Sequence, residues 1–219
     1  MEKNIPVLYK EKSECCGCGA CLNICPRNAI SMVEDECGFL YPEIDDNVCI
    51  RCKKCTLVCA FQNINENNKP LKTYAAVSKN KEQAVKSASG GVFAAIAKDF
   101  LNKGGIVFGA AFNEKKEVLH KSINKIEELY LLQGSKYVQS KIGNTYKEVK
   151  DLLIDGNKVL FSGTPCQVAG LKSYLGKEYD GLLTVDIICH GVPSEKIFQS
   201  YLQFMEGKYG GGLTYFTFR

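Results

Sequence analysis

From Thr73 onward, hydrophobic positions occur in short blocks whose spacing alternates between that of a strand and that of a helix. Blocks of consecutive or alternating apolar residues predict strands over residues 73–78, 105–112, 117–123, 158–162, 182–189 and 213–218. Blocks with apolar residues three and four positions apart predict helices over residues 89–103, 125–133, 145–155, 165–176 and 194–207. This alternation predicts an α/β domain with a mostly parallel sheet, in which the strand at 182–189 is buried.

Residues with capping chemistry mark several of the expected helix ends. Thr164 has the position of an N-cap, with a proline as the first helical residue after it, and Ser194 is the expected cap of the last helix. Thr145 and Glu148 form a capping-box signature, and Gly134 is the expected end of the helix over 125–133.

In open α/β sheets, ligands bind where strands end and helices begin. The unusual residues of this chain lie at four such turns, 87–91, 132–138, 162–167 and 189–194, so we expect a cofactor there. Ser89, Gly90 and Gly91 at a helix start suit a phosphate or pyrophosphate, although a plain tight turn explains them equally well. The chain contains neither G-x-G-x-x-G nor G-x-x-x-x-G-K-S/T, so it has no Rossmann fingerprint and no P-loop.

The first third of the chain contains a repeat of cysteines. Residues 15–25 read CCGCGACLNIC and residues 49–59 read CIRCKKCTLVC, which gives the spacing C-x-x-C-x-x-C-x-x-x-C twice, with an offset of 34 (49 − 15). This is the run of bacterial ferredoxins with two 4Fe-4S clusters, in which the fourth cysteine of each run holds the other cluster. We therefore expect one cluster on Cys15, Cys18, Cys21 and Cys59, and a second on Cys49, Cys52, Cys55 and Cys25.

One departure from the usual run is that Ala60, not proline, follows the second motif. Paired zinc sites are the alternative, because C-x-x-C pairs also bind zinc. Zinc sites rarely need the third cysteine of each run. Cys16 and Cys37 lie outside the pattern, and we interpret both as free or buried thiols.

Composition and charge exclude several classes of protein. The 219 residues are 45% hydrophobic, carry a formal net charge of +4 and show no dense lysine/arginine stripe, which argues against a nucleic-acid binder. No apolar stretch has the length of a membrane span, and the start of the chain lacks a secretory signal, so we expect a cytoplasmic protein. Twelve cysteines in that compartment indicate metal ligands rather than disulfides.

The polar, asparagine-rich segment 62–72 is the expected linker between a ferredoxin domain at 1–64, with an α+β ferredoxin-like dicluster fold, and the α/β part.

Within the α/β part, Cys166 and Cys189 each follow a predicted strand, yet neither belongs to the repeated motifs. His120 is expected on the surface. For the two cysteines, buried structural thiols are one interpretation, and a thiolate nucleophile at the helix start, with His190 as a base, is another.

The motifs SASGGVFAAIA, QGSKYVQS, FSGTPCQVAGLKSYL and VDIICHGVPS together resemble the beta subunit of coenzyme F-420-reducing hydrogenase and dehydrogenase. By this resemblance, residues 73–150 correspond to its N-terminal domain and residues 151–219 to the start of its C-terminal domain. The front resembles the ferredoxin module that many bacterial and archaeal members carry. The chain is then similar to a member that ends inside its C-terminal domain.

The resemblance implies an iron–sulfur flavoprotein that passes electrons between 4Fe-4S clusters and an FAD, which reacts with F-420 or another two-electron substrate. It implies that Cys166 and Cys189 are two of the four ligands of a third 4Fe-4S cluster, completed by residues outside this chain. A redox partner protein or subunit is also expected.

Turn position and the resemblance together predict the residues that line the flavin, which are Ser89, Gly90, Gly91, Gly134, Ser135, Lys136, Tyr137, Thr164 and Gln167. The rival hypothesis is a pure electron carrier, in which the ferredoxin module serves a partner enzyme, the α/β part is a docking scaffold and no flavin binds.

Overall fold

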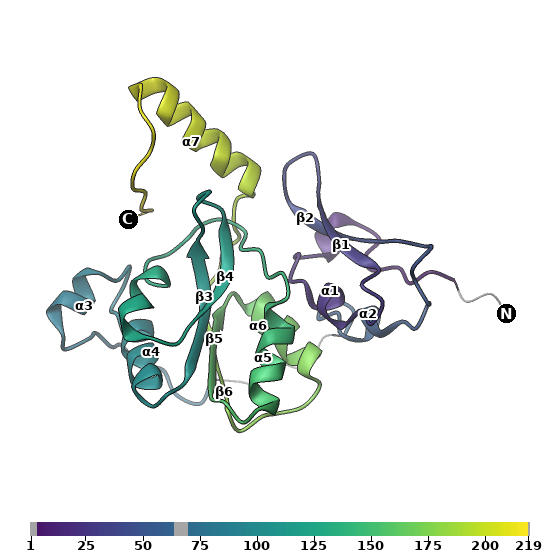
Figure 1. The fold of residues 1–219 in the computed structure, drawn as a ribbon, viewed down its shortest axis with the longest axis horizontal. Helices are drawn as coiled ribbons and strands as arrows, with labels where there is room; N and C mark the ends of the chain where they lie inside the picture. The colour runs from purple at the N-terminus through teal and green to yellow at the C-terminus, as the bar shows by residue number, and fades with distance from the viewer. Residues whose placement is uncertain (1–3, 64–69, 219) are drawn as a thin grey trace.

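The computed structural model describes residues 4–63 and 70–218 of the chain (Figure 1). Its cysteine-rich part contains a short 3-10 helix, two short helices and one antiparallel pair of strands. In chain order these are η1 (Lys12–Glu14), α1 (Ala20–Ile24), β1 (Ile30–Glu34), β2 (Leu40–Ile44) and α2 (Lys54–Leu57). Because α2 begins 34 residues after α1 (54 − 20), the repeat in the sequence is also a repeat in the structure.

A four-stranded mixed sheet forms the centre of the α/β part. Its strands are β3 (Ile106–Phe112), β4 (Val118–Ile123), β5 (Val159–Gly163) and β6 (Leu182–Asp186), in the order β4-β3-β5-β6. β3 and β4 form an antiparallel hairpin, whereas β3–β5 and β5–β6 pair in parallel. Two of the three pairings are thus parallel, as a mostly parallel sheet requires.

Helices cover both faces of this sheet (Figure 1). The elements on one face are α4 (Val92–Asn102), which follows the short α3 (Lys81–Val85), and the 3-10 helix η2 (Ile126–Leu131). On the other face lie α5 (Thr145–Ile154) and α6 (Pro165–Leu175). The neighbours Leu160 and Phe161 on β5 belong to opposite core clusters, because successive strand side chains point to opposite faces.

The cysteine-rich part shares its core with the α5/α6 face of the sheet. Ala20 of α1 and Val58 after α2 belong to the same buried cluster as Tyr146, Val149 and Leu171. In Figure 1 the cysteine-rich part lies beside α5 and α6.

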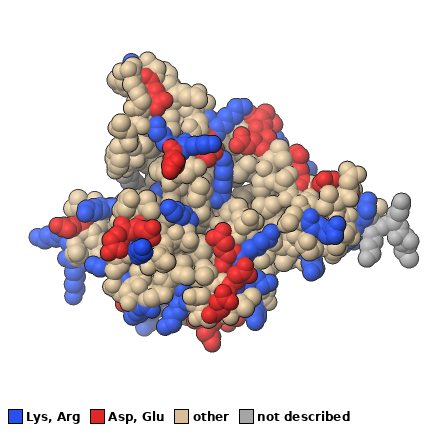
Figure 2. Space-filling view, viewed as in Figure 1, with Lys and Arg blue, Asp and Glu red and all other residues tan. Residues whose placement is uncertain are grey.

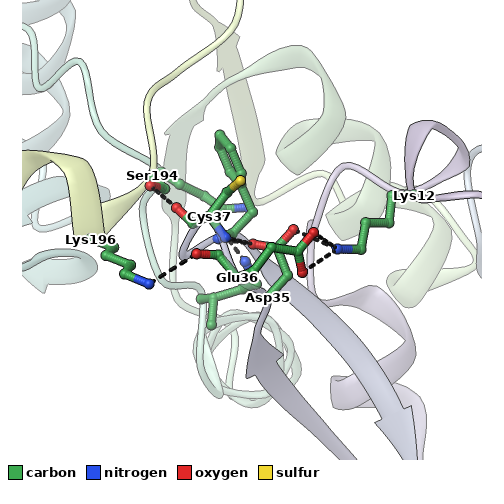
Figure 3. Close-up of polar contacts among 9 residues, drawn as sticks. Lys12, Asp35, Glu36, Cys37, Ser194 and Lys196 are labelled. Atoms are coloured by element: carbon green, nitrogen blue, oxygen red, sulfur yellow. Dashed lines mark hydrogen bonds and ion pairs between the residues drawn. The ribbon is translucent and has the colours of Figure 1, made fainter.

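The last helix, α7 (Glu195–Tyr209), is fixed at its start to the cysteine-rich part (Figure 3). The Ser194 hydroxyl donates to the carbonyl oxygen of Cys37 at 2.5 Å, and the Lys196 ammonium donates to the carbonyl oxygen of Glu36 at 2.9 Å. Both acceptors lie in the turn between β1 and β2. The segment that follows Cys189 is therefore attached to the cysteine-rich part.

Two predicted strands are wrong. Residues 73–78 are not a strand; Tyr74 and Val77 are exposed, and the backbone N–H of Ser78 instead donates to the carbonyl of Gly90 at 2.7 Å. Residues 213–218 are not a strand either, because their aromatic side chains pack on α7, with the rings of Phe216 and Phe218 5.2 and 5.6 Å from that of Phe198. Both segments are apolar enough for a strand, but neither is paired with a neighbouring strand.

Three further local predictions need correction. Asn144, not Thr145, caps α5, and the Thr145 hydroxyl donates to the carbonyl of Ile142, so the predicted capping box does not form. The segment predicted as a helix over 125–133 is the shorter 3-10 helix η2. Strand β6 ends at Asp186 and is only partly buried, because it lies at the edge of the sheet.

The capping of α6 and α7 is confirmed. Thr164 and Gln167 form a reciprocal capping box with Pro165 in the first turn, and the Ser194 side chain accepts from the backbone of Ile197. Most of the predicted linker, residues 64–69, lies outside the described residues. The predicted division at 150/151 falls within α5, and one sheet extends over both sides of it.

Basic and acidic side chains are intermixed on the face shown in Figure 2. Within residues 4–63 and 70–218, no helix has both the length and the apolar character needed to cross a membrane.

Candidate functional site

Two hollows in the cysteine-rich part collect the motif cysteines. The cysteines that line the first are Cys25, Cys49, Cys52 and Cys55. The motif cysteines that line the second are Cys15, Cys18, Cys21 and Cys59, and Cys16, which lies outside the motif, lines it as well. Each hollow thus takes three cysteines from one motif and the fourth from the other, as the crossed pattern of the sequence predicts.

The crossing follows from where each fourth cysteine lies. Cys25 is the C-cap of α1, and Cys59 directly follows the C-cap of α2, so each helix carries its last cysteine away from its own loop. Burial, and then the neighbouring thiols of Cys15, Cys55 and Cys59, raise the pKa of Cys21 to about 12. Since iron binds thiolate, loading of the site must release the protons that burial retains on these thiols.

The loops around the two hollows have the same backbone conformation. Gly17 and Gly19 have φ of 65° and 75°, and their counterparts Arg51 and Lys53 have φ of 56° and 61°. The left-handed region costs a non-glycine residue free energy, and the second loop adopts it nonetheless. In both copies the residue two positions on donates its backbone N–H to the first cysteine sulfur, at 3.5 Å from Gly17 to Cys15 and at 3.4 Å from Arg51 to Cys49.

These features fit a cubane cluster in each hollow. A 4Fe-4S cluster takes four thiolates, and backbone N–H groups near the sulfurs are a usual part of its surroundings. Among the described residues, no group of three or more His, Cys, Asp or Glu is arranged around a single metal ion. A cubane cluster does not need three protein ligands around one metal ion, because each of its four irons takes a single thiolate. The assignment of individual cysteines to clusters stays a prediction.

The first cysteine loop, which lines the second hollow, packs against α5 and α6. The Tyr146 hydroxyl lies 2.8 Å from the carbonyl oxygens of both Cys18 and Gln167, and so joins the first cysteine loop to α6. A Cβ atom at Gly170 would lie 3.0 Å from the Cys18 sulfur, so a larger residue here would push the loop and the helix apart by a few tenths of an ångström. In the sequence, the only feature that could indicate this contact is the glycine in the middle of a helical pattern. No feature of the sequence indicates the role of Tyr146.

Cys166 lies in this interface as well. Its sulfur is 3.1 Å from the Thr164 hydroxyl oxygen. The neighbouring Cys16 thiol and burial raise the pKa of Cys166, so at neutral pH the free residue is a thiol. This environment does not fit the interpretation as a thiolate nucleophile. Cys189 is exposed, and its sulfur accepts from the backbone N–H of Gly191 at 3.4 Å.

The residues predicted to line a flavin occupy three separate turns. Thr164 and Gln167 form the cap of α6, and the Lys136 ammonium donates to the carbonyl oxygens of Leu131 and Gln133 at 2.9 and 2.8 Å. Burial lowers the pKa of Lys136 to about 8. Gly90 packs closely on the backbone of Ala76. The sequence-based predictions for Ser89, Gly91, Gly134, Ser135 and Tyr137 stay predictions.

His120 is buried, which contradicts its predicted surface position. Its ring nitrogens lie 2.8 Å from the Ser140 hydroxyl and 3.1 Å from the carbonyl oxygen of Ser162, and its ring stacks on Phe161. Burial lowers its pKa to about 4, which the hydrogen bond to the backbone carbonyl of Ser162 only partly offsets. The histidine is therefore neutral and structural.

Two family models match the chain. Residues 14–63 match the 4Fe-4S dicluster domain, and residues 156–216 match the C-terminal part of the coenzyme F-420 hydrogenase/dehydrogenase beta subunit. No curated protein matches the chain in sequence.

Among solved structures, a chain of the F-420-reducing NiFe hydrogenase complex from Methanosarcina barkeri, studied by xenon derivatization, aligns with 21% identity and a TM-score of 0.46. The alignment covers 63% of this chain and 52% of that one, so the present chain spans about half of that neighbour's length.

Proposed function

We propose that the chain is an iron–sulfur flavoprotein oxidoreductase, because it belongs to the coenzyme F-420 hydrogenase/dehydrogenase beta subunit family and carries a 4Fe-4S dicluster domain. Electrons pass between the two clusters of the dicluster domain and an FAD, which reacts with F-420 or another two-electron acceptor. A redox partner protein exchanges electrons with the clusters. Clusters carry single electrons and a flavin exchanges pairs, so the two cofactors together connect both kinds of chemistry.

One observation carries this proposal. The first cysteine loop, which lines the second hollow with Cys15, Cys18 and Cys21, packs against α6, the helix that has Cys166 in its first turn. A dicluster domain that only served as a separate carrier would not need to bury its ligand loop against the α/β part. Here Tyr146 and the close approach at Gly170 hold the two together.

The proposal assigns different tasks to the two cysteines of the α/β part. Cys166, at the N-terminus of α6, and Cys189, after β6, supply two thiolates to a third 4Fe-4S cluster. Both follow the carboxyl ends of neighbouring parallel strands, β5 and β6, which is where α/β sheets bind cofactors. The FAD is proposed at the same edge, next to the turns at 89–91 and 134–137.

A ferredoxin-type electron carrier without a flavin is the second candidate. The observation that favours it is the internal use of predicted flavin contacts: Thr164, Gln167 and Lys136 already satisfy their polar groups within the chain. In that case the α/β part is a docking scaffold for a partner enzyme.

Cofactor content separates the two candidates. The chain is purified without oxygen, and iron, acid-labile sulfide and released flavin are counted per chain. About eight irons and one FAD support the flavoprotein. About eight irons without flavin, also after incubation with FAD, leave the carrier, and zinc in place of iron would refute both.

A further inference from the structure

Cys189 lies in a short exposed segment that is held at its two ends. At the front end, the backbone N–H of Ile187 donates to the carbonyl of Gly163, the last residue of β5, at 3.0 Å. At the rear end, the side chain of Ser194 is fully buried. Among the described residues, the only hydrogen bond that residues 188–192 make is the local one from Gly191 to the Cys189 sulfur. The place of Cys189 therefore depends on the two ends of its segment.

The rear end is held by the turn between β1 and β2 of the dicluster part (Figure 3). The Ser194 hydroxyl that donates to the carbonyl of Cys37 also accepts from the backbone N–H of Ile197 at 3.4 Å, so the same group caps α7 and binds the turn. The Lys196 ammonium adds the contact with the carbonyl of Glu36.

Gln139 ties the same end to the β1–β2 hairpin a second time. Its backbone N–H donates to the carbonyl of Pro193 at 3.0 Å, and its side-chain oxygen accepts from the backbone N–H of Leu40 at 3.1 Å. One residue thus connects the hairpin with the segment that carries Cys189.

Gly38 allows this turn to lie directly on the start of α7. Its φ is 82°, and a Cβ there would lie 2.2 Å from the Cβ of Lys196 and 3.2 Å from its backbone nitrogen. Cβ atoms do not approach other atoms to 2.2 Å, so any larger residue at position 38 has to move the turn away from α7.

The sheet fixes Cys166 and the front end of the Cys189 segment, whereas the β1–β2 turn fixes its rear end. We propose that this turn is a positioning element for the third cluster, in which Gly38 and Ser194 hold Cys189 in a fixed place relative to Cys166. This inference rests on the proposed function, because only there is Cys189 a cluster ligand. The dicluster part then helps to build the third site without supplying a ligand to it.

The test uses the iron-loaded full chain with a nitroxide spin label on Cys189. The line shape of its electron paramagnetic resonance spectrum reports how freely the segment moves, because loops move in nanoseconds to microseconds. Cys37→Ala removes a second exposed thiol and keeps the carbonyl that binds Ser194, and Cys52, the third exposed thiol, is held by iron in the loaded chain. Mass spectrometry confirms that Cys189 alone carries the label.

Two glycine variants in this Cys37→Ala background separate the contact from backbone strain. Gly38→Ala breaks the contact with α7, and Gly156→Ala is the matched control. Gly156 has a φ of 81°, and a Cβ there would have no neighbour within 4 Å among the described residues. Both variants carry the same left-handed strain, so only the contact with α7 differs.

The Cys37→Ala background and Gly156→Ala should both give a restricted spectrum. In Gly38→Ala the ratio of free to held segment should rise on the order of tenfold, as expected when an added methyl group overpacks a contact, so a fast component should appear. Adding Lys196→Gly removes the nearest atom and should reduce that fast component again, which a general loss of stability would not do.

A restricted spectrum in Gly38→Ala at full iron content would overturn this inference and leave the proposed function intact, and so would a fast component in the background itself. If Gly38→Ala loses iron, Ser194→Ala decides, because it weakens the same contact from the α7 side. A fast component in Ser194→Ala supports the inference, and a restricted spectrum overturns it. A wild-type chain that binds no iron would refute the proposed function itself, and the iron count shows this before any labelling.

Discussion

Gly170 allows a sharp test of how the dicluster part is held against the α/β part, because a second helical glycine serves as its control. Gly170 lies in the middle of α6, and a Cβ there would lie 3.0 Å from the Cys18 sulfur and 3.1 Å from the Tyr146 hydroxyl oxygen. Gly207 lies in α7, and a Cβ there would have no neighbour within 4 Å among the described residues.

Both substitutions to alanine gain helix propensity, which is worth about 1 kcal/mol in a helix interior and less near an end. At Gly207 this gain stands alone, so Gly207→Ala should raise the free energy of unfolding by ~0.5–1 kcal/mol. At Gly170 the added methyl group overpacks the interface, which costs about 1–3 kcal/mol, so Gly170→Ala should lower the free energy of unfolding by ~1 kcal/mol.

Thermal unfolding measures this difference directly. For a chain of this size, 1 kcal/mol corresponds to about 2–4 °C in Tm. Gly170→Ala should therefore melt below wild type and Gly207→Ala slightly above it, and Gly170→Ala should also retain less iron on dilution. If Gly170→Ala stabilised the protein as much as Gly207→Ala, the close contact between α6 and the Cys18 loop would be refuted.

Two further predictions concern buried polar groups. Tyr146→Phe leaves the carbonyls of Cys18 and Gln167 without their hydroxyl partner and should lower the free energy of unfolding by about 1–3 kcal/mol. The control is Tyr174→Phe in the same core cluster, which should lower it less. Equal losses of unfolding free energy for the two variants in urea titrations would contradict this prediction. Burial lowers the pKa of His120 from 6.5 to about 4, so the unfolded chain binds the extra proton and stability is lost as the pH falls from 6.5 to 4. His120→Gln should reduce this pH dependence, and an unchanged slope of unfolding free energy against pH would refute the role of the histidine.

The sequence predicted the parts of this protein that depend on local spacing. The strands β3 to β5 and the caps at Thr164 and Ser194 all follow from patterns a few residues long. The strands expected over 73–78 and 213–218 fail because a strand needs a neighbour, and local pattern cannot show whether a sheet edge is free to pair with it. The partial exposure of β6 has the same origin.

The contact between the two parts of the chain was not predicted, although it is central to the site. Cys16, Tyr146 and Gly170 lie far apart in the sequence, and their meeting depends on how α1 packs on α5 and α6. A glycine in the middle of a helix, such as Gly170, can mark a close approach but does not identify the partner.

The most direct test of the account is the non-additivity of iron loss in paired cysteine variants. If clusters are crossed as the hollows indicate, Cys15→Ala and Cys59→Ala remove the same cluster, and the double variant should keep about four irons per chain. The double variant of Cys15→Ala with Cys25→Ala should lose both clusters and keep almost no iron, although both residues belong to one motif. The reverse result, with about four irons kept by the Cys15/Cys25 pair and none by the Cys15/Cys59 pair, would show that each motif holds its own cluster and would contradict the account.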